Sequence, residues 1–392
     1  MFFDVTLSGS GKMACSSCHD PASHFAPPND RAVQLGGLDL KQPGLRAVPT
    51  LTYGMYTPAF SIGEEDAQSE AEEETPMQEA ARMAKRSLGK SKVDAPAPKT
   101  VFDHADEEAD EHAPRGGLML DGRVDTLQDQ AVLPLMSSFE MANRDPASLA
   151  ARIRKNYGDK IAQLAGRSVL NDTHALLAEA AFAIARYQVE EQAFHLFSSK
   201  YDAYLRGDET LSEAEMRGLK VFEDKDKGNC ADCHPNKPAA GLPPLFTDYQ
   251  YEAIGAPRNA EIPANSDLAY YDLGLCGPLR KDAIAANKAY CGFFKTPTLR
   301  NVAERKVFFH NGVYKSLEDV MRFYARRNTD PQLFYPKGKD GKVVAYNDLP
   351  SIHRKNVDVK DVPFNRKPGD APALDDQDIA DLVAFLKTLT DR

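Results

Sequence analysis

The pentapeptide Cys-X-X-Cys-His occurs twice in this 392-residue chain and constrains its fold more than any other feature. Two thiols three positions apart can bind the two vinyl groups of one haem, and the following imidazole can then serve as the proximal ligand of its iron. A thioredoxin-like redox pair or half of a zinc site would not require the trailing histidine, and no third cysteine lies near enough to complete a zinc tetrahedron. The sequence therefore predicts two covalently bound haem c groups, held by Cys15, Cys18 and His19 and by Cys230, Cys233 and His234.

The length and composition indicate a globular protein of two or three domains. Hydrophobic residues make up 42% of the chain, which is enough for real cores. No apolar run reaches the ~18 residues needed to cross a bilayer, so we expect no transmembrane segment. The formal net charge of -10 argues against a nucleic-acid partner.

Covalent haem attachment takes place in an oxidising, exported setting, which predicts a periplasmic location. The given chain shows no signal peptide, because Met1 to Asp4 runs almost directly into the first motif. We interpret this as an export leader that has been removed or left out of the numbering.

Acidic residues are concentrated in one segment, 63–112, which carries 15 Asp or Glu against 6 Lys or Arg. We interpret the segment as an insertion with one helix at about 76–88. This composition fits a segment that extends into solvent, and an arm that docks a partner is the alternative.

The first haem has few histidines available as a second axial ligand. No histidine lies between His24 and His104, and His104 falls in the acidic insertion. We therefore expect the first iron to keep an open face that can bind peroxide.

The stretch from Leu120 to Glu140 resembles the bacterial di-haem cytochrome c peroxidases and their relative MauG. It contains Asp-Gly-Arg, followed by Gln130, then Pro134 four residues and Glu140 ten residues after that glutamine. The resemblance implies that these three residues line the open face and that the glutamate moves protons while the O–O bond of peroxide breaks. The alternative is that they are ordinary surface residues. One departure is Leu120, where the family usually has tryptophan.

A second block, Phe294 to Val302 with Phe308 to Gly312, is also similar to this family. In its peroxidases a methionine fourteen residues after the block's histidine is the distal ligand of the second haem, and in MauG a tyrosine takes that place. Counting from His310 leads to Tyr324; the alternatives are Met321, one turn earlier, or no protein ligand at this place. The resemblance implies a His/Tyr-ligated second haem that shares or relays oxidising equivalents and could reach a bis-Fe(IV) state. The chain has no tryptophan to carry charge between the haems.

The remaining cysteines, Cys276 and Cys291, lie 15 positions apart. In an exported protein this favours a disulfide over two free thiols.

The family often holds a calcium ion between its haems, through an asparagine side chain and main-chain carbonyls. The corresponding places here read Ala47 and Arg305. We expect an absent or altered calcium site, with the Arg305 guanidinium substituting for the charge of the ion.

Hydrophobic periodicity predicts amphipathic helices at 147–157 and 173–191, and a run at 201–208 looks like an inter-domain linker. Ser212 with Glu215 forms a capping box, and Ser316 is expected to cap the helix that carries Tyr324. The last helix has a core stripe of Ile379, Leu382, Val383, Leu386 and Leu389.

These observations predict an all-α fold of two cytochrome c-like domains, each with one haem c. We expect a peroxidatic domain at 1–200, a second haem domain at 201–370, and a C-terminal helix at 371–392 that packs back on both. The predicted enzyme is a di-haem c-type peroxidase that reduces hydrogen peroxide with electrons from a donor protein or small reductant. The alternatives are a MauG-like oxidase that modifies a protein partner, and a di-haem electron carrier or redox sensor.

Overall fold

The computed structural model describes residues 1–63 and 113–392. It divides the chain into two compact units, one made of Met1–Phe60 with Arg115–Arg392 and the other of Ser61–Pro114. Apart from Gly63, the expected acidic insertion, its helix at 76–88 and His104 lie outside the described residues.

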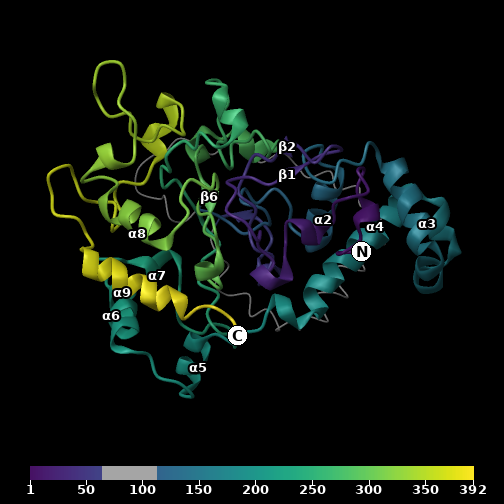
Figure 1. Ribbon diagram of the computed structural model, residues 1–392, viewed down its shortest axis with the longest axis horizontal. Helices are drawn as coiled ribbons and strands as arrows, with labels where there is room; N and C mark the ends of the chain where they lie inside the picture. Colours follow the sequence, from purple (N-terminus) through teal and green to yellow (C-terminus); the bar gives the residue numbers. More distant parts are fainter. Residues whose placement is uncertain (64–112) are drawn as a thin grey trace. The chain divides into compact units, whose positions relative to one another are not determined.

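The described part of the fold is mainly helical with few strands, which is the coarser form of the predicted all-α class. Its α-helices are α2 (Leu127–Met136), α3 (Pro146–Ala165), α4 (Thr173–Glu190), α5 (Lys200–Arg206), α6 (Glu213–Glu223), α7 (Cys230–Cys233), α8 (Leu317–Arg326) and α9 (Asp376–Lys387) (Figure 1). Two-residue strands pair as β1 (Leu35–Gly36) with β2 (Gln42–Pro43), β3 (Ser61–Ile62) with β4 (Pro114–Arg115), and β5 (Tyr251–Glu252) with β6 (Phe294–Lys295). Short 3-10 helices and irregular segments make up the rest of the described chain.

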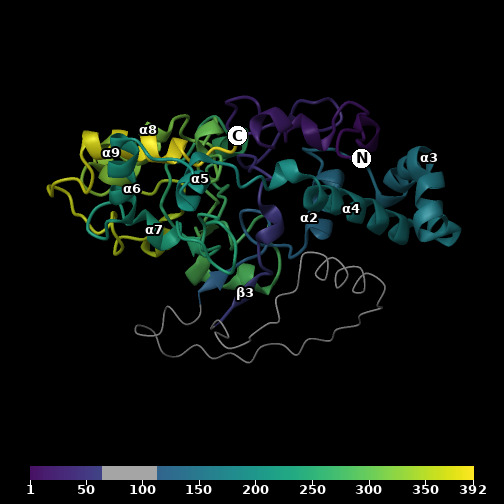
Figure 2. The same cartoon turned by 90° about the horizontal axis from the view of Figure 1, so that it is seen from below.

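The larger unit contains two groups of helices, each with its own core. Helices α2, α3 and α4 lie together, and α6, α8 and α9 lie together elsewhere (Figures 1 and 2). The first group surrounds a core that includes Leu149, Ile153 and Leu176, all at most 1% exposed. The second surrounds a core that includes Phe222 and Phe385. The predicted domain boundaries at residues 200 and 370 stay a prediction.

The predicted capping box at the start of α6 is confirmed. The Glu215 N–H donates to Ser212 Oγ at 3.4 Å, and the Ser212 N–H donates to Glu215 Oε2 at 2.6 Å. Ser316 likewise caps α8 through the Asp319 N–H, at 3.1 Å. These bonds satisfy backbone donors that a helix leaves without partners at its first turn.

The predicted core stripe of the last helix is also confirmed, because each of its five side chains is at most 5% exposed. Helix α9 packs against α6, and their main chains lie close together at Gly218. A Cβ atom there would overlap the main-chain carbonyl oxygen of Asp381. Glycine therefore permits this helix contact.

The run at 201–208, expected to be an inter-domain linker, forms helix α5 over most of its length, and its role as a linker stays a prediction. Ser199 caps the helix through a reciprocal bond with Asp202, and Tyr201 is 3% exposed. The Asp202 carboxylate also binds Arg300, whose Nη1 and Nη2 donate to it at 2.9 and 2.8 Å. Tyr201 and Tyr204, one turn apart, pack on the core of the second helical group, and the buried ion pair adds to this packing.

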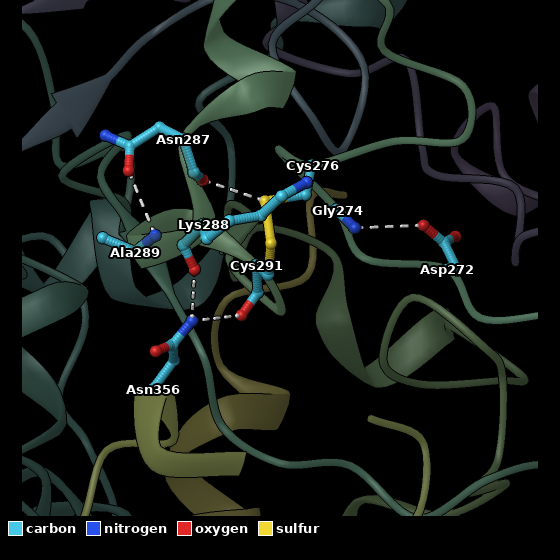
Figure 3. The surroundings of a disulfide bond; sticks show 8 residues. All are labelled: Asp272, Gly274, Cys276, Asn287, Lys288, Ala289, Cys291 and Asn356. Carbon is cyan, nitrogen blue, oxygen red and sulfur yellow. Dashed lines mark hydrogen bonds between the residues drawn. A yellow bond between two sulfur atoms is a disulfide. The ribbon is translucent and has the colours of Figure 1, made fainter. Parts of the chain in front are cut away.

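Cys276 and Cys291 form a disulfide in the structure, with their Cα atoms 5.0 Å apart (Figure 3). The Asn356 side chain binds the same turn, since its amide donates to the carbonyls of Lys288 at 2.9 Å and Cys291 at 3.0 Å. None of the helices in residues 1–63 and 113–392 is long and apolar enough to cross a membrane.

Candidate active site

The first Cys-X-X-Cys-His motif folds into a single tight turn. Cys15 to Ser17 form a 3-10 helix, and the His19 N–H donates to the Cys15 carbonyl at 2.9 Å. The His19 ring then donates from Nδ1 to the Phe25 carbonyl at 3.0 Å. The chain can present that carbonyl because His24 and Phe25 both adopt left-handed backbone conformations, with φ of 49° and 54°. The bond leaves Nε2 as the free nitrogen of His19.

The second motif repeats this arrangement on helix α7. The His234 N–H donates to the Cys230 carbonyl at 2.8 Å, and its Nδ1 donates to the Phe246 carbonyl, also at 2.8 Å. Phe246 is again left-handed, with φ of 54°. Sequence reasoning missed both phenylalanines, because nothing in their local sequence indicates a positive φ for so bulky a residue.

The protonation of these groups suits metal ligation better than dithiol redox chemistry. Burial lowers the pKa of His19 and of His234 to about 4, so each imidazole is neutral at pH 7. Burial raises the pKa of Cys15 and of Cys18 to about 11, whereas reactive redox thiols have a lowered pKa. The geometry and the thiol chemistry therefore fit the covalent attachment of haem at each motif.

A cavity opens beside the first motif, with about 1230 Å³ of space not filled by protein atoms, part of it open to solvent. The structure brings all the residues predicted for this site to the cavity wall: Cys15, Cys18, His19, Gln130, Pro134 and Glu140. Of the described residues that line it, His19 is the only histidine. No described side chain of the wall could therefore supply a second imidazole to an iron bound by His19.

Helix α2 positions Gln130 and Pro134 one turn apart on the cavity wall. Proline has no N–H, so Pro134 cannot form the helical bond to the Gln130 carbonyl four residues earlier. Beyond the end of the helix, the Met141 N–H donates to the Pro134 carbonyl at 3.1 Å, so the chain turns back toward α2. Glu140 lies in this returning loop, where burial raises the pKa of its carboxyl group and the Arg123 charge lowers it.

Two glycines that the sequence reading missed hold the Glu140 loop in place. The Gly37 N–H donates to the Glu140 carbonyl at 2.8 Å. A Cβ atom at Gly36 would overlap the Phe139 carbonyl oxygen. The Gly-Gly dipeptide was an available signal, since such pairs mark tight turns or close backbone approach.

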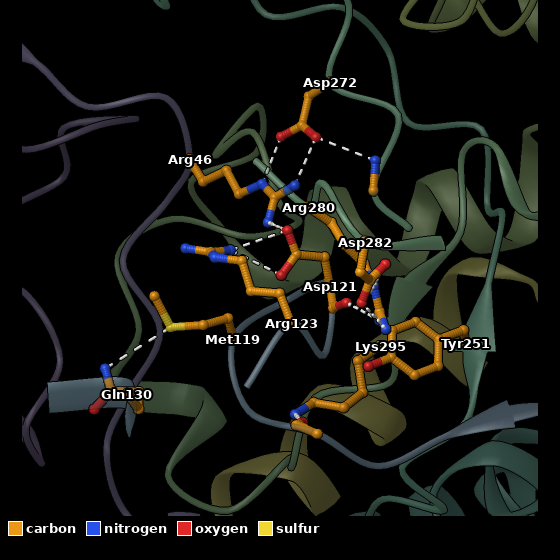
Figure 4. A network of polar contacts seen from close by, with 12 residues as sticks. Arg46, Met119, Asp121, Arg123, Gln130, Tyr251, Asp272, Arg280, Asp282 and Lys295 are labelled. Carbon is orange, nitrogen blue, oxygen red and sulfur yellow. Dashed lines mark hydrogen bonds and ion pairs between the residues drawn. The ribbon is translucent and has the colours of Figure 1, made fainter. Parts of the chain in front are cut away.

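Charged side chains from distant parts of the chain form one polar network (Figure 4). Arg46 binds Asp272 through Nε and Nη2 at 2.6 and 2.7 Å, and binds Asp121 through Nη1 at 2.8 Å. Arg123 donates from Nη1 to both oxygens of Asp121, at 2.7 and 2.9 Å. Arg280 donates to the Asp121 main-chain carbonyl at 2.8 Å. Arg46 and Arg123 also line the cavity, so this network fixes part of its wall.

At the second site, Tyr324 on α8 and Cys230 pack against the same core cluster. Burial raises the pKa of Tyr324, and the nearby Cys233 and Cys230 thiols raise it further. Its ring stacks on Phe364, with centroids 5.1 Å apart. Met321 packs against the same cluster, so both candidate ligands face this region.

Comparisons with known proteins agree with this geometry. The sequence profile of the family described as "Di-haem cytochrome c peroxidase" matches residues 1–210. The chain is similar to the methylamine utilization protein MauG of Paracoccus denitrificans, with 31% identity over 407 residues, which cover 100% of this chain and 87% of that protein. It is also similar to the cytochrome c551 peroxidase of Nitrosomonas europaea, with 26% identity over 228 residues, 58% of this chain and 59% of that protein.

Among solved structures, the diheme peroxidase BthA from Burkholderia thailandensis superposes on this chain with a TM-score of 0.80 and 35% identity. The match covers 100% of this chain and 84% of that chain. The similarity in structure therefore extends over both motifs.

Proposed function

Because this chain belongs to the di-haem cytochrome c peroxidase family, we propose that it reduces hydrogen peroxide at a haem attached to Cys15 and Cys18. The chain is an oxidoreductase of a family that acts on peroxide. The observation that carries the choice of site is the cavity, which has Cys15, Cys18 and His19 in its wall together with Glu140 and Gln130.

The two haems would supply the redox chemistry of peroxide reduction and storage of the oxidising equivalents, for which a bis-Fe(IV) state is the prediction from the sequence. Glu140 would take a proton from the near oxygen of peroxide and return it to the leaving oxygen. The Gln130 amide would hold water or peroxide by hydrogen bonds. Since His19 is the only histidine in the described cavity wall, we expect activity without prior reduction of the protein.

Replacing Glu140 by Gln tests the assignment. The amide keeps the size of the side chain but cannot accept the proton, so the optical change of the ferric protein after one equivalent of peroxide should slow by about 10²-fold or more. Asp159→Asn removes a carboxylate from an exposed position on α3 and serves as the control. Equal rates for wild type and Glu140→Gln would remove Glu140 from the mechanism. A ferric protein that ignores peroxide until it is half-reduced would refute the open first site.

We propose His234 and Tyr324 as the axial ligands of the second haem. A phenolate ligand favours the oxidised states of iron, whereas a thioether favours the ferrous state. The low-spin electron paramagnetic resonance signal should therefore change in Tyr324→Phe and stay unchanged in Met321→Leu. The opposite result would assign the ligand to Met321.

A MauG-like oxidase is the second candidate function, and the full-length similarity to MauG favours it. The absence of tryptophan from the chain weighs against hole transfer to a protein partner by the usual aromatic route. An electron carrier is less well supported, because it has no use for a carboxylate in the wall of an open haem cavity. Rapid peroxide turnover with a small reductant would support the peroxidase. Slow peroxide turnover, together with oxidation of a protein that is added in place of the small reductant, would support the oxidase.

Three finer proposals accompany the peroxidase function. The electron donor is a protein or small reductant, and the location is the periplasm, because covalent haem attachment requires an oxidising compartment. The calcium site is absent or altered, since Ala47 and Arg305 replace the usual ligands. Metal analysis that finds one tightly held calcium per chain would contradict the last proposal.

A further inference from the structure

The Arg305 guanidinium has an unusual set of partners. Arg305 follows the 3-10 helix Val302–Glu304, and its Nη2 donates to the Val48 carbonyl at 3.1 Å. Within residues 1–63 and 113–392, this is the one hydrogen bond that its guanidinium makes, and no carboxylate pairs with it. A guanidinium carries five N–H donors, so most of its hydrogen-bonding capacity has no acceptor in the described chain.

Other buried arginines in the described residues are well supplied with acceptors. Arg46 binds two carboxylates and Arg300 binds one. Arg327 lacks a carboxylate, but it donates to the main-chain carbonyls of Ile254 and Asp358 and to the Asn328 side chain, and it stacks on Phe364. The fold thus provides several acceptors where a guanidinium is buried, whereas the half-buried Arg305 has a single one among the described residues.

Arg305 lies beside the cavity of the first motif. Val48, which accepts its hydrogen bond, lines that cavity, as does the next residue, Pro49. Burial lowers the pKa of Arg305 itself to about 10, because no nearby anion compensates its charge.

We propose that Arg305 binds a propionate of the haem attached to Cys15 and Cys18. The inference rests on the proposed function, because it requires haem at this motif. A propionate is a carboxylate that the cofactor itself brings, and guanidinium matches carboxylate in both charge and planar geometry. The thioether bonds would keep the haem at this motif, so the propionate would be available to the guanidinium for as long as the haem is attached. The charge of Arg305 then serves to position the cofactor and to set its redox properties.

This pairing has two measurable consequences. A cation near the haem favours the ferrous state, which carries one positive charge less, so it raises the midpoint potential. It also keeps the paired propionate ionised. Without the cation the pKa of that propionate should rise, and the potential of the first haem should then depend more strongly on pH.

The test compares Arg305→Met and Arg305→Lys with Lys306→Met. Lys306 is exposed and next in the chain, so its replacement removes the same charge without touching the cavity. The midpoint potentials of both haems would be measured by spectroelectrochemistry from pH 5 to pH 8. We expect Arg305→Met to lower the potential of the first haem and steepen its pH dependence. Arg305→Lys should show a smaller shift, and Lys306→Met should leave both haems unchanged.

Covalent haem content is measured first, as the pyridine haemochrome, because it separates two kinds of failure. A wild-type chain without two covalent haems would overturn the proposed function. If both proteins carry two covalent haems and the first haem has the same potential in wild type and in Arg305→Met, this inference alone is overturned. Equal shifts in Arg305→Met and Lys306→Met would also overturn it, since the effect would then be one of net charge. Should Arg305→Met fail to fold, Arg305→Lys decides the question through the propionate bending modes of its resonance Raman spectrum, which must differ from wild type.

Discussion

At the residue scale, the chemistry of the first site depends on which partner each charged group has. Burial raises the pKa of Glu140, and the Ser137 side chain and the Arg123 charge both oppose that rise. Arg123 is itself held by both oxygens of Asp121, a residue with no exposed surface. The Asp121 carboxylate thus holds the arginine that keeps Glu140 available as a proton acceptor.

We therefore predict that Arg123→Met moves the pH dependence of the peroxide reaction. Removing the cation should raise the pKa of Glu140 further, so a larger fraction of its carboxyl group is protonated at a given acid pH. Because the reaction needs the carboxylate, the fall in rate on the acid side should begin at a higher pH. Stopped-flow rates with ferric protein between pH 4.5 and pH 8 would measure the shift.

Arg144→Met is the matched control, since the Arg144 side chain is 87% exposed and pairs only with its neighbour Asp145 among the described residues. Its pH profile should match that of wild type. If Arg123→Met lowers the rate equally at every pH, the arginine acts on the fold or on peroxide binding, and its effect on Glu140 is refuted.

At the element scale, the close approach of two helices requires glycine at a helical position where intrinsic propensity would favour alanine. Gly218 lies inside α6, where alanine would ordinarily be favoured by about 1 kcal/mol. The α9 main chain occupies the space that a methyl group at this position would need. Gly158 in α3 has no such neighbour, because a Cβ atom there would lie 3.7 Å from the Arg154 side chain.

The two glycines should therefore respond in opposite ways to the same substitution. Gly218→Ala should lower the free energy of unfolding by about 1–3 kcal/mol, because α6 and α9 must move apart. Gly158→Ala should leave it unchanged or raise it by up to about 1 kcal/mol. Denaturant titration followed by circular dichroism measures both. Equal free energies of unfolding for the two variants would show that α6 and α9 can move apart at little energetic cost.

At the scale of the whole molecule, one polar network joins segments far apart in the sequence. Arg46 connects Asp121 with Asp272, and the segment that carries Asp272 also contains the disulfide between Cys276 and Cys291. The disulfide limits the freedom of this segment in the unfolded chain, and the network binds it to the wall of the first cavity.

Replacing Cys276 and Cys291 together by serine should lower the free energy of unfolding by about 3 kcal/mol, from the loop-closure entropy of a 15-residue loop. The absorption spectrum of the folded protein should stay close to wild type, because the haem motifs keep their own cysteines. An unchanged denaturation midpoint would show that the fold, rather than the covalent bond, orders this segment.

Local sequence was enough to predict several elements and the composition of the site. The capping box at Ser212 and the stripe of the last helix depend on contacts within one turn or one face, so they can be read directly. Helix α5 was missed because its seven residues are too few for a clear periodic pattern, and because its bond from Asp202 reaches Arg300, 98 positions away. Phe25 and Phe246 were missed because a left-handed backbone at such residues is stabilised by tertiary packing and not by their own preference.

The sequence alone determined the chemical groups: two Cys-X-X-Cys-His turns, a glutamate and a glutamine at a set spacing, and a tyrosine on an amphipathic helix. These depend on spacing along the chain, which covalent geometry translates directly into local positions. Only the tertiary structure decided which of them share a cavity, which carbonyl orients each histidine, and which cation lacks a partner. Those properties arise from long-range packing and burial. Packing sets the distances between residues that are far apart in the sequence, and burial shifts the pKa of each group.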